Sequence, residues 1–151
     1  MNATAAEQFV STNHESIVND ESKLHETFGI GDAVHQGDII IIGINGLPPG
    51  AKHRANRQLA DGSTQGSRHV MTRGKVFDCD PESISRAIKD ATGIRVDARY
   101  CGPVFVSPKN PTADDLSHPE HGNHGFPAGQ VCAVVFQRNL DAEQREQRVR
   151  D

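Results

Sequence analysis

The residues best suited to do chemistry are histidines gathered in one short segment. The run Ser117–Gly125 reads SHPEHGNHG and places His118, His121 and His124 at equal intervals. Imidazole nitrogens and a carboxylate are the donors that zinc and iron accept when no thiolate is offered. Pro119 restrains this segment, so that neighbouring rings can turn toward one ion. The spacing therefore predicts a metal site with His118 and His121 as ligands and His124 as a further candidate.

Two residues extend this candidate site. His69 follows Gly66 and Ser67 at the edge of a predicted strand, and it is our candidate for a ligand from a distant part of the chain. Glu120 is a candidate for orienting a histidine ring N–H, with a direct ligand or a solvated charge as alternatives. The competing interpretation of the whole segment is a solvated surface loop. No residue is assigned a catalytic role, and whether the protein is an enzyme stays open.

The elements that must position these residues are mostly strands. Asp38–Ile44 is a β-branched run closed by Asn45 and Gly46, which predicts a buried strand. Residues 68–71 and 75–78 are expected to form a hairpin across Arg73 and Gly74. Further strands are expected at residues 94–100, 103–107 and 130–137.

One helix is expected among the strands, at about residues 81–92. Asp80 is suited to cap its first amides, Pro81 suits the first helical position, and Gly93 is suited to end it. The pattern predicts a mainly-β fold, a small barrel or sandwich with this one inserted helix and with flexible or helical termini. An α+β domain is the alternative.

The chain divides into three parts by composition. Residues 1–35 form a polar N-terminal arm with at most a short helix near residues 15–27, residues 36–139 form the β domain, and residues 140–151 form a charged tail. Only 35% of the residues are hydrophobic, so the core is thin. Thin domains gain stability by association. We therefore expect a homo-oligomer or a larger protein assembly formed through the arm.

Charge and hydropathy exclude several classes of protein. Sixteen Lys and Arg against twenty Asp and Glu give a net charge of -4, which argues against nucleic-acid binding through phosphate contacts. The longest apolar run, around Ile39–Ile42, is too short for a membrane helix. The first residues lack a signal peptide, so the cytoplasm is the expected location, or a virion if the chain is phage-encoded. Cys79, Cys101 and Cys132 are expected to be free thiols.

Several short motifs occur in the same order as in a known group of proteins. They are Gln36-Gly37-Asp38 before a strand, Gly66-Ser67-Arg68-His69, His118-Pro119-Glu120-His121-Gly122, Pro127-Ala128-Gly129 and Gln137-Arg138. Together they resemble a family of small, uncharacterised proteins of bacteria and their mobile elements, from Gln36 to about Arg148. The resemblance implies that His69, His118 and His121 belong to one site.

The chain departs from this family at Ser67, where the family has a further histidine. His124 is our own candidate to replace that ligand. The resemblance implies no particular reaction. Two main hypotheses therefore stand: a metal-binding β domain that uses zinc or iron, and a structural or assembly protein, such as a virion decoration or a mobile-element accessory protein, without catalysis. A third hypothesis is a regulator whose histidines titrate near physiological pH.

Overall fold

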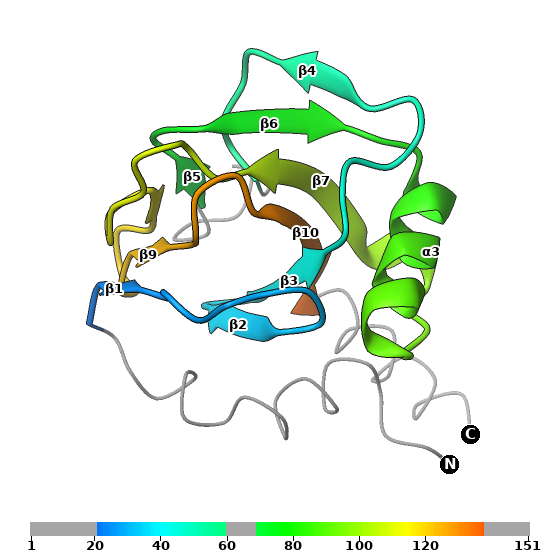
Figure 1. Ribbon diagram of the computed structural model, residues 1–151, viewed down its shortest axis with the longest axis horizontal. Coiled ribbons are helices and arrows are strands. Elements are labelled where there is room, and N and C mark those ends of the chain that lie inside the picture. The colour runs from blue at the N-terminus through cyan, green and yellow to red at the C-terminus, as the bar shows by residue number, and fades with distance from the viewer. Residues whose placement is uncertain (1–20, 60–68, 138–151) are drawn as a thin grey trace, which may run out of the picture.

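The computed structural model describes residues 21–59 and 69–137. The first part of the predicted arm and the predicted charged tail lie outside these residues. Within them, the strands form two sheets, one of four strands in the order β1-β9-β8-β5 and one of six in the order β2-β3-β10-β7-β6-β4 (Figure 1). The strands are β1 Lys23–Leu24, β2 Ala33–Gln36, β3 Ile39–Ile44, β4 Lys52–Arg54, β5 Val70–Met71, β6 Lys75–Asp78, β7 Cys101–Val106, β8 Leu116–Ser117, β9 His124–Gly125 and β10 Val131–Phe136.

Strand β3 explains why the isoleucine run is continuous. All six of its residues are buried because both faces of the larger sheet are covered. Ile39 and Ile41 face a core shared with the smaller sheet, which also contains Phe105 and Phe126. The alternate residues Ile40 and Ile42 belong to a second core, on the helix side. A strand covered on both faces needs apolar residues at every position rather than at every second one.

The helix α3, Pro81–Thr92, covers the second face of the larger sheet. Asp80 caps it by accepting a hydrogen bond from the Ser83 amide, and Gly93 ends it in a left-handed conformation with φ 76°. Ile84 and Ile88 are its buried residues. The predicted bounds of this helix are confirmed, because the capping residues that define them are local in sequence.

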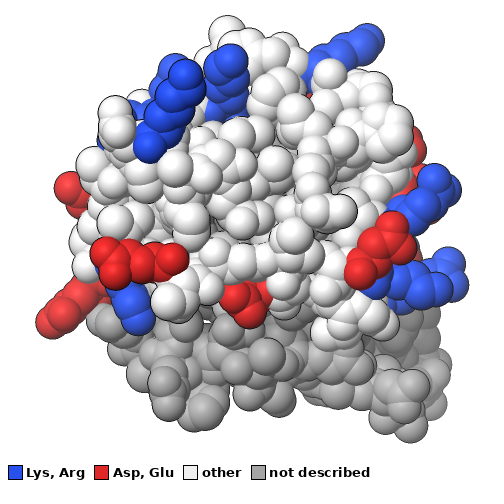
Figure 2. All heavy atoms as spheres, viewed as in Figure 1, with Lys and Arg blue, Asp and Glu red and all other residues white. Residues whose placement is uncertain are grey.

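The prediction of a mainly-β fold with one inserted helix is confirmed for the described residues, as a sandwich of two sheets that do not close. None of their helices is long and apolar enough to pass through a membrane. Cys79, Cys101 and Cys132 are free, and Cys132 is buried in β10. On the face in Figure 2, Lys and Arg lie beside Asp and Glu at the lower left and right, Lys and Arg stand apart from them at the upper left, and other residues cover the centre.

Three local expectations differ from the structure. Residues 21–35, assigned to the arm, include β1 and all but the last residue of β2, and Phe28 is buried in the core between the sheets. The expected hairpin does not form, because β5 and β6 lie in different sheets. Residues 94–100 form no strand and end in the short 3-10 helix Ala98–Tyr100, since Asp97 caps a turn there by accepting from the Arg99 amide.

Candidate metal centre

Strand pairing in the smaller sheet brings two of the predicted histidines together. Strands β5 and β8 are antiparallel, with Val70 opposite Ser117. His69 directly precedes β5 and His118 directly follows β8, so both leave the sheet at the same end. Their ring centroids lie 4.4 Å apart, and both side chains are buried.

The turn between β2 and β3 contains further polar residues of the site. Gln36 pairs with Ile39, so the connection is the two-residue loop Gly37-Asp38. Gly37 has φ 58°, a conformation that suits glycine at the first position of a tight hairpin turn. The turn places Gln36 and Asp38 on either side of the His69 ring.

Gln36 holds the His69 ring in one tautomer. The Gln36 Nε2 group donates hydrogen bonds to the carbonyl oxygens of Leu116 and Gly122, each at 3.0 Å. The Gln36 Oε1 atom is therefore the atom that faces His69 Nδ1, at 2.8 Å. An amide oxygen only accepts hydrogen bonds, so Nδ1 carries the proton. The neutral His69 ring then presents a lone pair at Nε2.

That lone pair faces a carboxylate. His69 Nε2 lies 3.0 Å from Asp38 Oδ1. Burial is the largest influence on His69 and lowers its pKa from 6.5 to about 4, although Asp38 opposes this shift. The ring is thus neutral at pH 7, and two acceptors stand at hydrogen-bonding distance. Such a contact becomes favourable when either a proton on Nε2 or a metal ion lies between the two atoms.

His118 has the opposite tautomer. Its Nδ1 atom accepts hydrogen bonds from the backbone amides of Glu120 and His121, at 3.0 and 3.2 Å. A nitrogen that accepts cannot carry the proton of a neutral ring, so the proton of His118 is on Nε2. These bonds also fold residues 118–121 into a turn, which brings the His121 ring centroid to 4.7 Å from that of His118.

His121 reaches back to the β2–β3 turn. A Cβ atom placed on Gly37 would lie 3.0 Å from His121 Nε2 and 3.3 Å from His69 Cε1. The two rings therefore border the same point, beside Asp38. His121 is partly exposed, and the Asp38 side chain is 31% exposed, so the site is reached from solvent on this side.

The other two predicted residues are placed differently. His124 Nδ1 lies 2.8 Å from His25 Nε2, and its ring stacks on that of His25 rather than joining the His69 and His118 rings. Glu120 contacts His118 through its backbone N–H, while its side chain is exposed. The Glu120 main chain donates to His118 Nδ1, which is a different contact from the predicted one between its carboxylate and a ring N–H, and it is Gln36 that orients His69.

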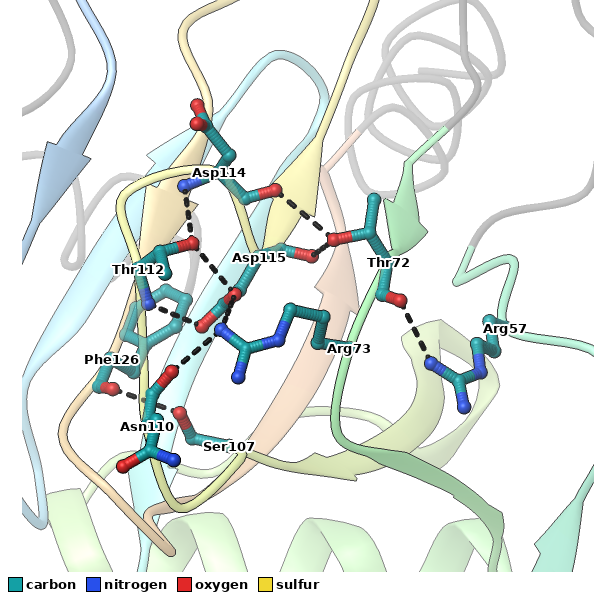
Figure 3. Close-up of polar contacts among 9 residues, drawn as sticks. All are labelled: Arg57, Thr72, Arg73, Ser107, Asn110, Thr112, Asp114, Asp115 and Phe126. Carbon is teal, nitrogen blue, oxygen red and sulfur yellow. Dashed lines mark hydrogen bonds and ion pairs between the residues drawn. The ribbon is translucent and has the colours of Figure 1, made fainter.

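A polar network around the buried Asp115 carboxylate fixes the loop that leads into β8 (Figure 3). The Asp115 carboxylate accepts hydrogen bonds from the Thr112 amide and hydroxyl at 2.9 Å and is contacted by Arg73 at 3.3 Å. The Asp115 carbonyl oxygen accepts from the Thr72 amide, which ties the loop to the end of β5. His118 lies three residues beyond Asp115, so this network sets the position from which the histidine turn begins.

Sequence reasoning did not single out Gln36 and Asp38 as site residues. The available signal was the Gln-Gly-Asp turn before the isoleucine strand, which places two polar side chains at the end of a buried hairpin. The side chains of residues 21–59 and 69–137, as they lie, include no group of three or more His, Cys, Asp or Glu arranged to hold a metal ion.

We compared the chain with known proteins, and one protein family matches it. No curated protein and no solved structure matches the chain. A family model described as Domain of unknown function (DUF8820) matches residues 35–135. This range includes Gln36, Asp38 and the three clustered histidines. On this match over most of its length, the chain belongs to the DUF8820 family.

Proposed function

We propose that this protein is a metal-binding β domain whose site takes a divalent transition metal, zinc or iron, through His69, Asp38 and His121. The observation that carries the proposal is the 3.0 Å contact between His69 Nε2 and Asp38 Oδ1. Gln36 holds the His69 proton on the far nitrogen, so both facing atoms are acceptors. A metal ion between them satisfies both.

The dimensions of the contact agree with shared coordination. Histidine nitrogen and carboxylate oxygen bind zinc at about 2.0–2.2 Å, so two such ligands on one ion stand about 3 Å apart when the angle between them is near a right angle. His121 is the third ligand, since its Nε2 atom borders the same point as His69. Asp38 and His121 are partly exposed, so their side chains can rotate toward the ion without opening the core.

The surroundings of His69 support the same function. Histidine ligands characteristically donate their second N–H to an oxygen that fixes the ring, and Gln36 Oε1 occupies that position. Two histidines and one carboxylate are a ligand set for catalytic zinc and for non-haem iron, and each leaves coordination positions for water or another ligand. All three ligands lie in the matched range, so we expect the site to be common to the family.

Metal analysis of protein purified without an affinity tag tests this proposal. After addition of zinc or iron and removal of excess ion, we expect close to one ion per chain. The variant Asp38→Asn keeps the shape of the side chain but removes its charge, and His69→Gln removes the nitrogen ligand. Both variants are expected to lose at least 10-fold in metal affinity, whereas His53→Ala, which changes an exposed histidine on β4, keeps it.

Circular dichroism of each variant separates a lost ligand from a lost fold. If the unmodified protein holds less than about a tenth of an ion per chain after both metals are supplied, where a bound site should hold one, the proposal is wrong. Unchanged affinity in the folded Asp38→Asn variant would remove Asp38 from the ligand set.

A further inference from the structure

We propose that a cavity beside the first turns of α3 binds a small zwitterion of the α-amino acid class, whose carboxylate contacts Arg95 and whose ammonium contacts Glu82. The cavity has a volume of about 420 Å³ and is lined by Glu82, Ser85, Arg95, Val96, Asp97 and Ala98. It lies beside α3, on the opposite side of the molecule from β5 and β9 (Figure 1). The proposal therefore does not rest on the metal site.

Two stretches of the chain form the walls of this cavity. Glu82 and Ser85 belong to the first turns of α3, and residues 95–98 belong to the connection that follows the helix. The Ser85 hydroxyl donates a hydrogen bond to the Val96 carbonyl oxygen, which ties the two stretches together. The Val96 side chain is buried in the core on the helix side. The walls are therefore anchored in the fold.

The cavity offers one carboxylate and one guanidinium to a ligand. The side chains of Glu82 and Arg95 form no hydrogen bond and no ion pair with any residue in the described ranges. The other carboxylate of the lining is already engaged, because Asp97 accepts hydrogen bonds from the Arg99 amide at 2.9 Å and from its guanidinium at 3.0 and 3.2 Å. Glu82 and Arg95 are thus the charges that a ligand can neutralise.

The arrangement of these charges selects a zwitterion. Glu82 and Arg95 line one cavity but do not form an ion pair with each other. A molecule with an ammonium and a carboxylate on one carbon atom can bridge them, and the planar guanidinium of Arg95 suits a carboxylate. The Ser85 hydroxyl proton is used by the Val96 carbonyl, so Ser85 Oγ can offer only its lone pairs to the ligand. It therefore supports the ammonium end.

The rest of the lining limits the side chain of the ligand. Val96 and Ala98 are the apolar residues of the lining, and the lining includes no aromatic ring. Small-molecule sites have volumes of about 300–1,000 Å³, so this cavity is at the lower end of that range. We therefore expect amino acids with small side chains, such as glycine, alanine and serine, to be preferred over aromatic ones.

A titration followed by the NMR shifts of backbone amides tests this proposal. The probes are L-alanine, which has both charges, acetate, which has the carboxylate alone, and methylammonium, which has the ammonium alone. A chelator is present, because amino acids also bind metal ions. We expect L-alanine to shift the amides of residues 82–85 and 95–98 with a millimolar dissociation constant, since ion pairs of exposed side chains are weak. It is expected to bind about fivefold more tightly than either of the other probes.

Two variants remove one charge each from the cavity. Arg95→Gln and Glu82→Gln are each expected to weaken L-alanine binding about fivefold, which brings it near the binding of the singly charged probes. Arg86→Gln and Asp90→Asn are the matched controls, because both residues are exposed on α3 and lie outside the lining. These controls should keep the affinity of the parent. Circular dichroism of each variant checks that the fold is retained.

Several results would overturn the proposal. One is that acetate or methylammonium binds as tightly as L-alanine. Another is that Arg95→Gln or Glu82→Gln, while folded, keeps the affinity of the parent. A third is that no amide of the two stretches shifts in about 0.1 M L-alanine, where a millimolar site is nearly saturated. None of these results affects the metal site, which the metal analysis above tests separately.

Discussion

Gln36 determines the chemistry of His69 without belonging to the ligand set. Its amide N–H groups are committed to Leu116 and Gly122, so its oxygen has only one orientation toward the ring. The same side chain also links the end of β2 in the larger sheet to the loop after β8 in the smaller one. A single glutamine therefore couples the orientation of the histidine to the packing of the two sheets.

The variant Gln36→Leu tests this coupling. Without the Gln36 oxygen, the proton of the His69 ring is no longer held on Nδ1, and we expect metal affinity to fall about 10- to 100-fold. The carbonyl groups of Leu116 and Gly122 also lose their hydrogen-bond donor, so we expect the free energy of unfolding in urea to fall by about 1–3 kcal/mol. Gln130→Leu is the control, because Gln130 donates to the carbonyls of Ile44 and Val131, away from the site. Equal metal affinity in both variants would contradict the role of Gln36.

Gly37 is the second residue whose effect on the site can be isolated. An added Cβ would lie 2.8 Å from His121 Cδ2, so Gly37→Ala is expected to displace His121 and weaken metal binding at least 10-fold. The left-handed conformation adds a backbone cost of about 1 kcal/mol. Gly50→Ala carries a similar cost at φ 77° but meets nothing within 4 Å. Calorimetric titration should show a loss of affinity for the first variant and none for the second.

At the scale of elements, local signals predicted the parts whose boundaries are set by neighbouring residues. The caps of α3 and the isoleucine run of β3 are of this kind. A strand of two residues has too short a pattern to be recognised from sequence, so β1 was not predicted within the polar arm. Its pairing with β9, Lys23 opposite His124, depends on contacts between distant segments.

The same distinction applies to the site. His69, His118 and His121 were grouped by their order in a resemblance, and the pairing of β5 with β8 and the turn after His118 bring them together. The partner of His124 depends on β1, which places His25 beside it. Asp38 was predicted to begin the isoleucine strand, and only the turn from β2 into β3 shows that it faces His69.

The loop before β8 gives a prediction at this scale. Asp115→Ala removes the acceptor shared by Thr112 and Arg73, so we expect the free energy of unfolding to fall by about 2–3 kcal/mol. Because β8 then starts from a looser loop, metal affinity is expected to fall as well. Asp90→Ala, at an exposed position on α3, should change stability by less than about 0.5 kcal/mol. A stability loss in Asp115→Ala no larger than in Asp90→Ala would show that the network is not needed.

At the scale of the whole molecule, the structure is a sandwich whose smaller sheet is completed by β1. His25 follows this strand, donates its backbone N–H to the Gly125 carbonyl, and stacks its ring on those of His124 and Phe126. Burial is the main cause that lowers the pKa of both His25 and His124 from 6.5 to about 4. The closure of the smaller sheet therefore depends on two neutral histidines.

The expected consequence is a loss of stability in mild acid. In the unfolded chain both rings take up protons near pH 6.5, whereas in the folded chain they stay neutral down to about pH 4. The unfolded state thus binds more protons between these values, and the free energy of unfolding falls as the pH drops through this range.

In His25→Phe, whose ring can keep the stacking on Phe126, we expect a smaller fall in the free energy of unfolding than in the parent. Urea unfolding between about pH 7 and pH 5, with a chelator present to exclude metal effects, measures this slope. His53→Phe is the control and should keep the slope of the parent; if His25→Phe keeps it too, the histidine pair does not govern the acid sensitivity of the fold.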